Sequence, residues 1–167
     1  GDITVTSDSS GTLSISKTII GSNPAIGIET GLSGSYSTGN VTITGNAKVT
    51  IDMTHNGTSG SDNAYGIFAK ENITISDDAS VDITCATPNN TTGGGNCNGL
   101  YAKNNVIINT NGTIKINVTK AGKDENNGYS FGIYPMGAAT FTKVGNMEVQ
   151  WKKDASVSAN SGGVVYK

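Results

Sequence analysis

Short runs in which apolar residues alternate with polar ones recur along most of the chain. Residues 73–76 (Ile-Thr-Ile-Ser) and 81–84 (Val-Asp-Ile-Thr) are two examples, and the turn residues Asp77 and Asp78 lie between them. Alternation with a period of two, built from valine, isoleucine and threonine, is typical of a strand that buries one face. The sequence therefore predicts many short β-strands joined by tight turns.

These runs belong to a repeat about 33 residues long. Residues 65–84 return with few changes at 98–118, so that Gly66 corresponds to Gly99, and a third copy begins at Gly132. Each unit holds three runs and fits one coil of a parallel β-helix, because such a coil buries its apolar face only by stacking on the next. We expect right-handed winding, since parallel crossovers almost always take that hand.

A period of this length is also typical of ankyrin repeats, which contain two helices per unit. No window of this chain has apolar residues at helical spacing, and its 23 glycines in 167 residues would destabilise stacked helices. The sequence therefore favours one all-β domain over residues 1–167, a right-handed parallel β-helix of about five coils with three strands each. Residues 1–40 form an irregular first coil, and residues 41–167 form the regular coils.

Stacking places every residue directly on its equivalent in the next coil, so the repeat also predicts columns of side chains. Three columns face inward as core, namely Val5, Ile43, Ile75, Ile108 and Phe141; Leu13, Val49, Val81, Ile114 and Met147; and Ile28, Ile67, Leu100, Ile133 and Val164. Two polar columns are expected outside, namely a charge column of Thr50, Asp82, Lys115 and Glu148, and a turn column of Asp8, Asn46, Asp78 and Asn111.

An aromatic column is the most suggestive candidate site. Phe68, Tyr101 and Tyr134 each follow an inward apolar residue, so the alternation points them outward and in line. Ring faces arranged in this way can carry the apolar CH surface of a sugar, while Lys70 and Lys103 hydrogen-bond its hydroxyls. Two alternatives stay open: the rings stack only to stabilise the coils, or a slip of the alternation at the glycine turns them inward.

Longer polar loops follow the last run of each coil and should gather on one edge, where repeat proteins usually place binding. They are residues 54–63, 85–98, 119–130 and 154–161. Cys85 and Cys97 stand at the two ends of one of these loops. A disulfide between them would order a Thr/Asn/Gly-rich segment and suits a secreted protein, and two free buried thiols are the alternative.

Asp77 and Asp78 are the candidate metal ligands, because carboxylate oxygens are the ligands that Ca²⁺ prefers. Turn chemistry explains them better, since carboxylates are few and scattered in this chain. We expect no cofactor, with Ca²⁺ as the open alternative. We also expect no enzyme: His55 is the only histidine, we interpret it as a surface loop residue, and no nucleophile-histidine-acid set or phosphate loop is visible.

Charge and composition argue against two classes of binding partner, nucleic acid and membrane. The net charge is −2 and all eleven basic residues are lysines, so the chain lacks arginine, the usual bidentate reader of guanine and phosphate. We expect no nucleic-acid partner. No apolar run is long enough to cross a bilayer, so we expect no membrane insertion. The chain begins without methionine or a signal peptide, and we expect it to be a processed or trimmed piece.

The phrases at 66–76 (Gly-Ile-Phe-Ala-Lys-Glu-Asn-Ile-Thr-Ile-Ser) and 99–109 (Gly-Leu-Tyr-Ala-Lys-Asn-Asn-Val-Ile-Ile-Asn) resemble a family of secreted bacterial β-helix proteins described as carbohydrate-binding domain-containing. The resemblance covers residues 25–167. It implies a pectate-lyase-like architecture without lyase activity, and binding of acidic polysaccharide assisted by Ca²⁺.

The leading hypothesis is therefore non-catalytic binding of a polysaccharide or glycan by a secreted protein at the bacterial cell surface. The alternative is an adhesin or spacer segment of a larger surface protein, with a protein as its partner. A polysaccharide-cleaving enzyme ranks third. The sequence leaves the glycan and the oligomeric state open.

Overall fold

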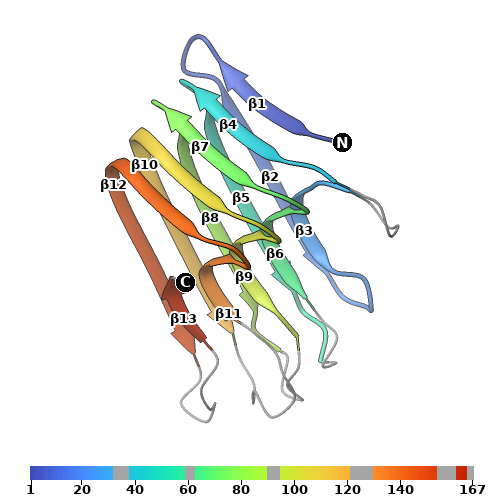
Figure 1. Cartoon of the computed structure of the whole chain (residues 1–167). Helices are drawn as coiled ribbons and strands as arrows, with labels where there is room; N and C mark the ends of the chain where they lie inside the picture. Colours follow the sequence, from blue (N-terminus) through green and yellow to red (C-terminus); the bar gives the residue numbers. More distant parts are fainter. Residues whose placement is uncertain (32–37, 59–62, 90–94, 121–129, 154–160, 165–167) are drawn as a thin grey trace.

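The computed structural model describes residues 1–31, 38–58, 63–89, 95–120, 130–153 and 161–164. Within these residues the chain forms strands and no helix (Figure 1). The strands are β1 (Ile3–Ser7), β2 (Thr12–Ile19), β3 (Ala25–Glu29), β4 (Val41–Gly45), β5 (Lys48–His55), β6 (Ala64–Ala69), β7 (Ile73–Asp77), β8 (Ser80–Thr87), β9 (Cys97–Ala102), β10 (Val106–Lys120), β11 (Ser130–Pro135), β12 (Ala139–Lys153) and β13 (Ser161–Val164).

The strands wind into a right-handed parallel β-helix of about four turns, which confirms the expected fold class. The first face holds β1, β4, β7 and the leading parts of β10 and β12; the second holds β2, β5, β8 and the trailing parts of the same two strands. The third face is a separate five-stranded sheet in the order β13-β11-β9-β6-β3. Each coil contributes one strand to this sheet, so its five strands correspond to the five coils expected from the sequence.

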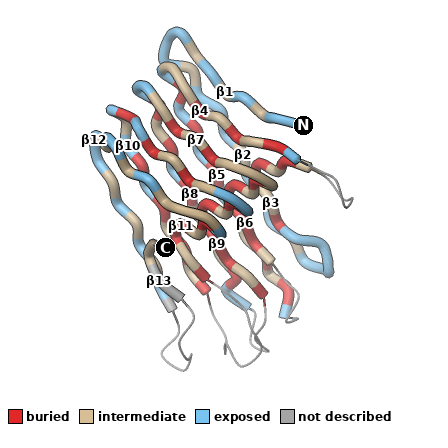
Figure 2. The backbone as a smooth tube through the Cα atoms, viewed as in Figure 1, coloured by how far each residue is buried: buried red, intermediate tan, exposed pale blue. Residues whose placement is uncertain are grey.

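The strand registers confirm the predicted columns. On the first face, Ile75 pairs with Ile43 on one side and Ile108 on the other, and the columns of the other two faces keep the predicted order. The charge column is also in register. Inward residues of the middle coils are fully buried, whereas Leu13 in the first coil keeps 37% of its surface exposed. Figure 2 shows this gradient, with buried positions concentrated between the outer coils.

The strands are longer than the alternation predicts. β10 runs without a break from Val106 to Lys120 and passes through Asn111, which the sequence predicts to lie in a turn. The chain bends there through register shifts while it stays paired with β12, so the strand is not interrupted. On the second face, β5 and β8 also extend to His55 and Thr87. The loops at this edge are correspondingly shorter than predicted.

A column of glycines lets the second and third faces approach closely. A Cβ atom placed on Gly99 would lie 2.3 Å from Ile116 Cγ2 and 2.6 Å from the carbonyl oxygen of Gly132 in the next coil. Gly66 faces Ile83 in the same way, at 2.4 Å. These distances are far inside van der Waals contact, so no other residue fits without movement of the core. The branched side chains of the second face fill the space that the missing Cβ atoms leave.

We predict that Gly99→Ala lowers the free energy of unfolding by about 2–3 kcal/mol, because the added methyl overpacks the core against Ile116 and the neighbouring backbone. Gly163→Ala is the matched control, since its Cβ would lie 3.8 Å from Val149, an ordinary contact in the same column. The control should change stability by less than about 0.5 kcal/mol. Denaturant unfolding measures both; equal losses would contradict the close approach.

Candidate ligand-binding face

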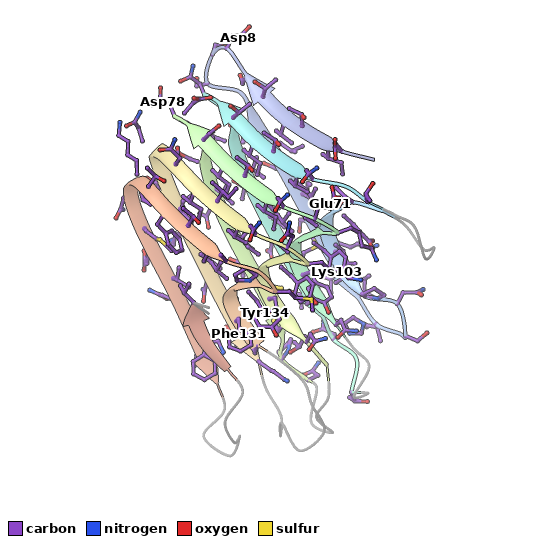
Figure 3. All side chains as sticks on the ribbon, in the orientation of Figure 1. Asp8, Glu71, Asp78, Lys103, Phe131 and Tyr134 are labelled. Carbon is purple, nitrogen blue, oxygen red and sulfur yellow. The ribbon has the colours of Figure 1, made fainter. Side chains whose placement is uncertain are left out.

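The aromatic column lies on the outward side of the third face, as the alternation predicts. Strand pairing aligns Phe68 of β6, Tyr101 of β9 and Tyr134 of β11, and all three side chains are partly exposed. Figure 3 shows Tyr134 beside β11, with Phe131 next to it. The alternative in which these rings turn into the core is therefore wrong.

A local break in the alternation brings another ring to the same side. Gly66 and Ile67 are both buried, and the Cβ position of Gly66 faces the core. Tyr65 and Phe68, on either side of this pair, both point outward, and their ring centroids lie 5.3 Å apart. The two rings are three residues apart and still share one surface, because two consecutive positions between them face inward.

Phe131 and Tyr134 repeat this arrangement in β11, with ring centroids 4.8 Å apart and planes 9° from parallel. The sequence analysis missed Tyr65 and Phe131. The signal that finds them is a pair of aromatic residues spaced by three around a glycine, at 65–68 and again at 131–134. The aromatic cluster is the name used below for Tyr65, Phe68, Tyr101, Phe131 and Tyr134.

The rings of this cluster cover one another's faces. Phe68 and Tyr101 stack with centroids 5.0 Å apart and planes 5° from parallel, and Tyr65 meets both of them edge-on. Tyr101 also contacts Tyr134, at 5.5 Å. Rings that stack from coil to coil turn their edges outward, so the predicted flat platform of ring faces is not formed. The exposed edges carry the partial positive charge of the ring quadrupole.

Lys70 and Lys103 flank the cluster at equivalent positions of consecutive coils, two residues after Phe68 and Tyr101 respectively. The Lys70 ammonium lies 5.1 Å from the centroid of the Phe68 ring, which is within the range of a cation–π interaction. Lys103 is exposed. The two lysines place positive charge and hydrogen-bond donors beside the ring edges.

Tyr65 anchors the cluster to the loop edge. Its side chain is 8% exposed, and its hydroxyl accepts a hydrogen bond from Asn96 Nδ2 at 3.0 Å. Burial raises the pKa of Tyr65 to about 12, although the bond from Asn96 acts in the opposite direction. Asn98 lies between Tyr65 and Phe131 in the strand register and is completely buried. Its Oδ1 accepts the Phe131 N–H at 2.9 Å, whereas its Nδ2 has no hydrogen-bond partner within the described part of the chain.

The candidate Ca²⁺ ligands lie at the turn between β7 and β8 and already have partners in the protein. The Asp77 carboxylate accepts hydrogen bonds from the Thr44 hydroxyl and the Gly45 N–H, and these bonds lower the pKa of Asp77. Asp78 accepts a 2.8 Å bond from Asn111 Nδ2. Among the described residues, no group of three or more His, Cys, Asp or Glu is placed to hold a metal ion. Calcium binding by Asp77 and Asp78 stays the open alternative.

An asparagine ladder that the sequence analysis missed stabilises the corner before the first face. Asn105 Nδ2 donates to Asn72 Oδ1 at 3.1 Å, and Asn72 Nδ2 donates to Asn40 Oδ1 at 2.9 Å. The ladder continues from Asn40 Nδ2 to Asp2 Oδ1, and from the Ala138 N–H to Asn105 Oδ1. Its sequence signal is an asparagine directly before the first-face strands β4, β7 and β10, with an aspartate in the same place before β1.

The prediction that His55 is a surface residue is wrong. His55 is completely buried at the end of β5, Nδ1 accepts the Gly57 N–H at 3.1 Å, and Nε2 lies 2.9 Å from the Asn23 carbonyl oxygen. Because Nδ1 accepts, Nε2 carries the hydrogen and donates. Thr87 and Lys120, which end β8 and β10, are buried as well. Buried polar side chains therefore lie where each of these strands passes into a loop, and His55 satisfies backbone groups of the loops beside it.

Cys85 and Cys97 are free thiols in this structure, and both are completely buried. Burial raises the pKa of the Cys85 thiol, and so does its hydrogen bond with Cys97. Cys97 Sγ also contacts the Thr119 carbonyl oxygen at 3.6 Å. The two residues predicted to pair are thus brought together by the fold, and the disulfide itself stays a prediction.

Comparison of the chain with protein-family models, curated proteins and solved structures found no match. The resemblance to secreted carbohydrate-binding β-helix proteins therefore stays a prediction. In the described part of the chain, no helix is long and apolar enough to cross a membrane.

The raised pKa of Tyr65 predicts a loss of stability at high pH. An unfolded tyrosine ionises near pH 10, whereas Tyr65 in the folded chain ionises near 12. The stabilisation is complete below pH 10 and is lost as the pH rises towards 12, by roughly 2–3 kcal/mol. Denaturant unfolding across this range measures the fall. In Tyr65→Phe the fall should be smaller by that amount; equal slopes in both proteins would contradict the assignment.

Proposed function

We propose that this protein binds a polysaccharide or glycan without cleaving it, and that the aromatic cluster is its contact surface. The observation that carries the proposal is the gathering of five aromatic rings on the outward side of one face of the solenoid. Four of the five rings, all but Tyr65, are partly exposed. Outward aromatic residues that are only partly buried are typical of binding surfaces, because their apolar area is available to a ligand.

The geometry favours contact through ring edges. Stacking occupies the faces of Phe68 and Tyr101, and Lys70 lies over the Phe68 ring. Electropositive ring edges suit the oxygen atoms of a saccharide, and the ammonium groups of Lys70 and Lys103 add charged donors. A glycan chain that runs along the stack would meet an aromatic ring followed by a lysine in two consecutive coils, at Phe68 and Lys70 and again at Tyr101 and Lys103. This mode replaces the stacking of sugar rings on aromatic faces that the sequence alone suggests.

The remaining parts of the proposal rest on composition and on the fold. We place the protein outside the cell or on the bacterial cell surface, since Thr/Asn/Gly-rich solenoids with few charges suit that environment. No cofactor is part of the proposed mode, because lysine and ring edges supply the attraction. Calcium assistance through Asp77 and Asp78 is the alternative that the binding experiment tests.

A second candidate function is that of a spacer or adhesin segment with a protein partner. Continuous parallel pairing from β1 to β12 and the asparagine ladder favour it, because both make the solenoid a stiff rod. In this case the aromatic cluster would serve only to stabilise neighbouring coils.

A glycan array, probed with and without a calcium chelator, tests the proposal. We expect a hit on one polysaccharide class that persists in chelator. For that glycan, Tyr101→Ala should weaken binding more than tenfold, equivalent to about 1.4 kcal/mol. Binding is measured well below the melting temperature of the variant, because loss of stacking also lowers stability.

Lysine variants separate binding from stability. Lys103→Ala should weaken binding several-fold and leave the melting temperature unchanged, since Lys103 is exposed. Lys115→Ala is the matched control, because it removes an exposed lysine from the second face. A blank array, or equal effects of the two lysine variants, would favour the spacer function. Loss of the hit in chelator would restore Asp77 and Asp78 as calcium ligands.

A further inference from the structure

Cys85 and Cys97 connect two different faces of the solenoid through its core. Cys85 lies in β8 of the second face and Cys97 opens β9 of the third face. Both are completely buried in the same core cluster where β8 packs against β9, and Cys97 lies close enough to Cys85 to raise the pKa of its thiol. A covalent bond between them would join two faces that are otherwise held at this edge by packing and hydrogen bonds.

The residues on either side of Cys97 hold members of the aromatic cluster. Asn96 donates to the Tyr65 hydroxyl at 3.0 Å, and Asn98 accepts the Phe131 N–H at 2.9 Å. Asn98 also carries a buried Nδ2 that has no hydrogen-bond partner among the described residues, which is a rare and costly arrangement. Asn96 and Asn98 are the chain neighbours of Cys97, so a displacement of Cys97 moves the two amides that hold Tyr65 and Phe131.

The folded protein offers an oxidant almost no access to these thiols. Neither sulfur has exposed surface, and burial raises the pKa of the Cys85 thiol, so the reactive thiolate is scarce. Exchange with a small disulfide then requires opening of the core. In an unfolded chain the same thiols have ordinary reactivity.

We propose that Cys85 and Cys97 form a disulfide while the chain folds, that the closed core then preserves this oxidation state, and that the bond sets the arrangement of the aromatic cluster through Asn96 and Asn98. The pair is thus a covalent brace for the candidate binding face. The inference does not depend on glycan binding, because it concerns the geometry of the rings.

The chemistry is thiol–disulfide exchange with a small-molecule disulfide such as oxidised glutathione. The thiolate of one cysteine attacks a glutathione sulfur, breaks the glutathione disulfide and forms a mixed disulfide, releasing one glutathione thiolate. The second cysteine thiolate attacks the protein sulfur of this mixed disulfide and releases the second glutathione. The two protons lost by the cysteines end on the two glutathione thiolates. The protein is oxidised and glutathione is reduced by the same two electrons.

Refolding tests the proposal. The chain is unfolded, reduced and refolded in either oxidised or reduced glutathione, and native reduced protein is incubated in oxidised glutathione for the same time. Mass spectrometry should show the loss of two hydrogen atoms, with a Cys85–Cys97 peptide link, after oxidative refolding and at least tenfold less of it in the native sample. The closed loop should raise the melting temperature by roughly 6–12 °C.

Near-ultraviolet circular dichroism reports on the tyrosines of the cluster. The oxidised and reduced forms should differ in this signal, and the difference should shrink in Tyr65→Phe, whose ring cannot bond to Asn96. Cys85→Ala is the control that removes the bond, and it should show no dependence on the refolding conditions. The comparison of oxidised with reduced wild-type protein stands even where this variant does not fold.

Three results would overturn the proposal. They are the absence of the link after oxidative refolding, its formation at the same rate in native protein, and identical tyrosine spectra of the two forms. The first removes the bond, the second removes its protection by the core, and the third removes its coupling to the cluster. A blank glycan array leaves all three measurements unaffected, so failure of the proposed function is distinguishable from failure of this inference.

Discussion

The close approach of the second and third faces at the glycine column is the constraint on which the rest of the structure depends. Each coil has room for one branched side chain of the second face, such as Ile83 or Ile116, only because the opposing residue has no Cβ. A shift of register by one residue would put a side chain where none fits, so the column fixes the alignment of the second and third faces. A thin core thus achieves tight packing with few large residues.

The same constraint produces the candidate binding face. Gly66 must face the core, and Ile67 follows it inward, so the chain turns its flanking positions outward and brings the rings of Tyr65 and Phe68 together on the outer side. Repetition in later coils brings further rings close, at the spacing of neighbouring parallel strands, which is about 4.8 Å. This spacing is near that of stacked rings, so the faces cover one another and the edges remain for a ligand. The shape of the surface is therefore a consequence of how the core packs.

Much of the fold could be predicted because the sequence shows two periods. The alternation of apolar and polar residues predicts whether each side chain faces the core or the solvent. The 33-residue repeat predicts which residue lies next to it in the following coil. The column of Phe68, Tyr101 and Tyr134 follows from these two periods. The orientation of the rings does not follow from them, because alternation says nothing about side-chain torsions. For this reason the prediction that the ring faces form a flat platform was wrong. The burial of His55 also escaped prediction, since it depends on loop backbone groups that no period describes.

The two amide-to-amide bonds of the asparagine ladder, from Asn105 to Asn72 and from Asn72 to Asn40, each run from one coil to the coil before it and use the same pair of groups. A coil with asparagine at this corner can therefore join an existing coil on one side and receive another on the other side, wherever it stands in the stack. Gain or loss of one whole repeat with this asparagine leaves the ladder chemically unchanged, whereas gain of part of a repeat does not. A change in the length of the solenoid by whole repeats therefore preserves this corner. The last coil has Ala138 in place of this asparagine and donates only a backbone N–H to Asn105. The ladder of side-chain amides therefore ends at Asn105.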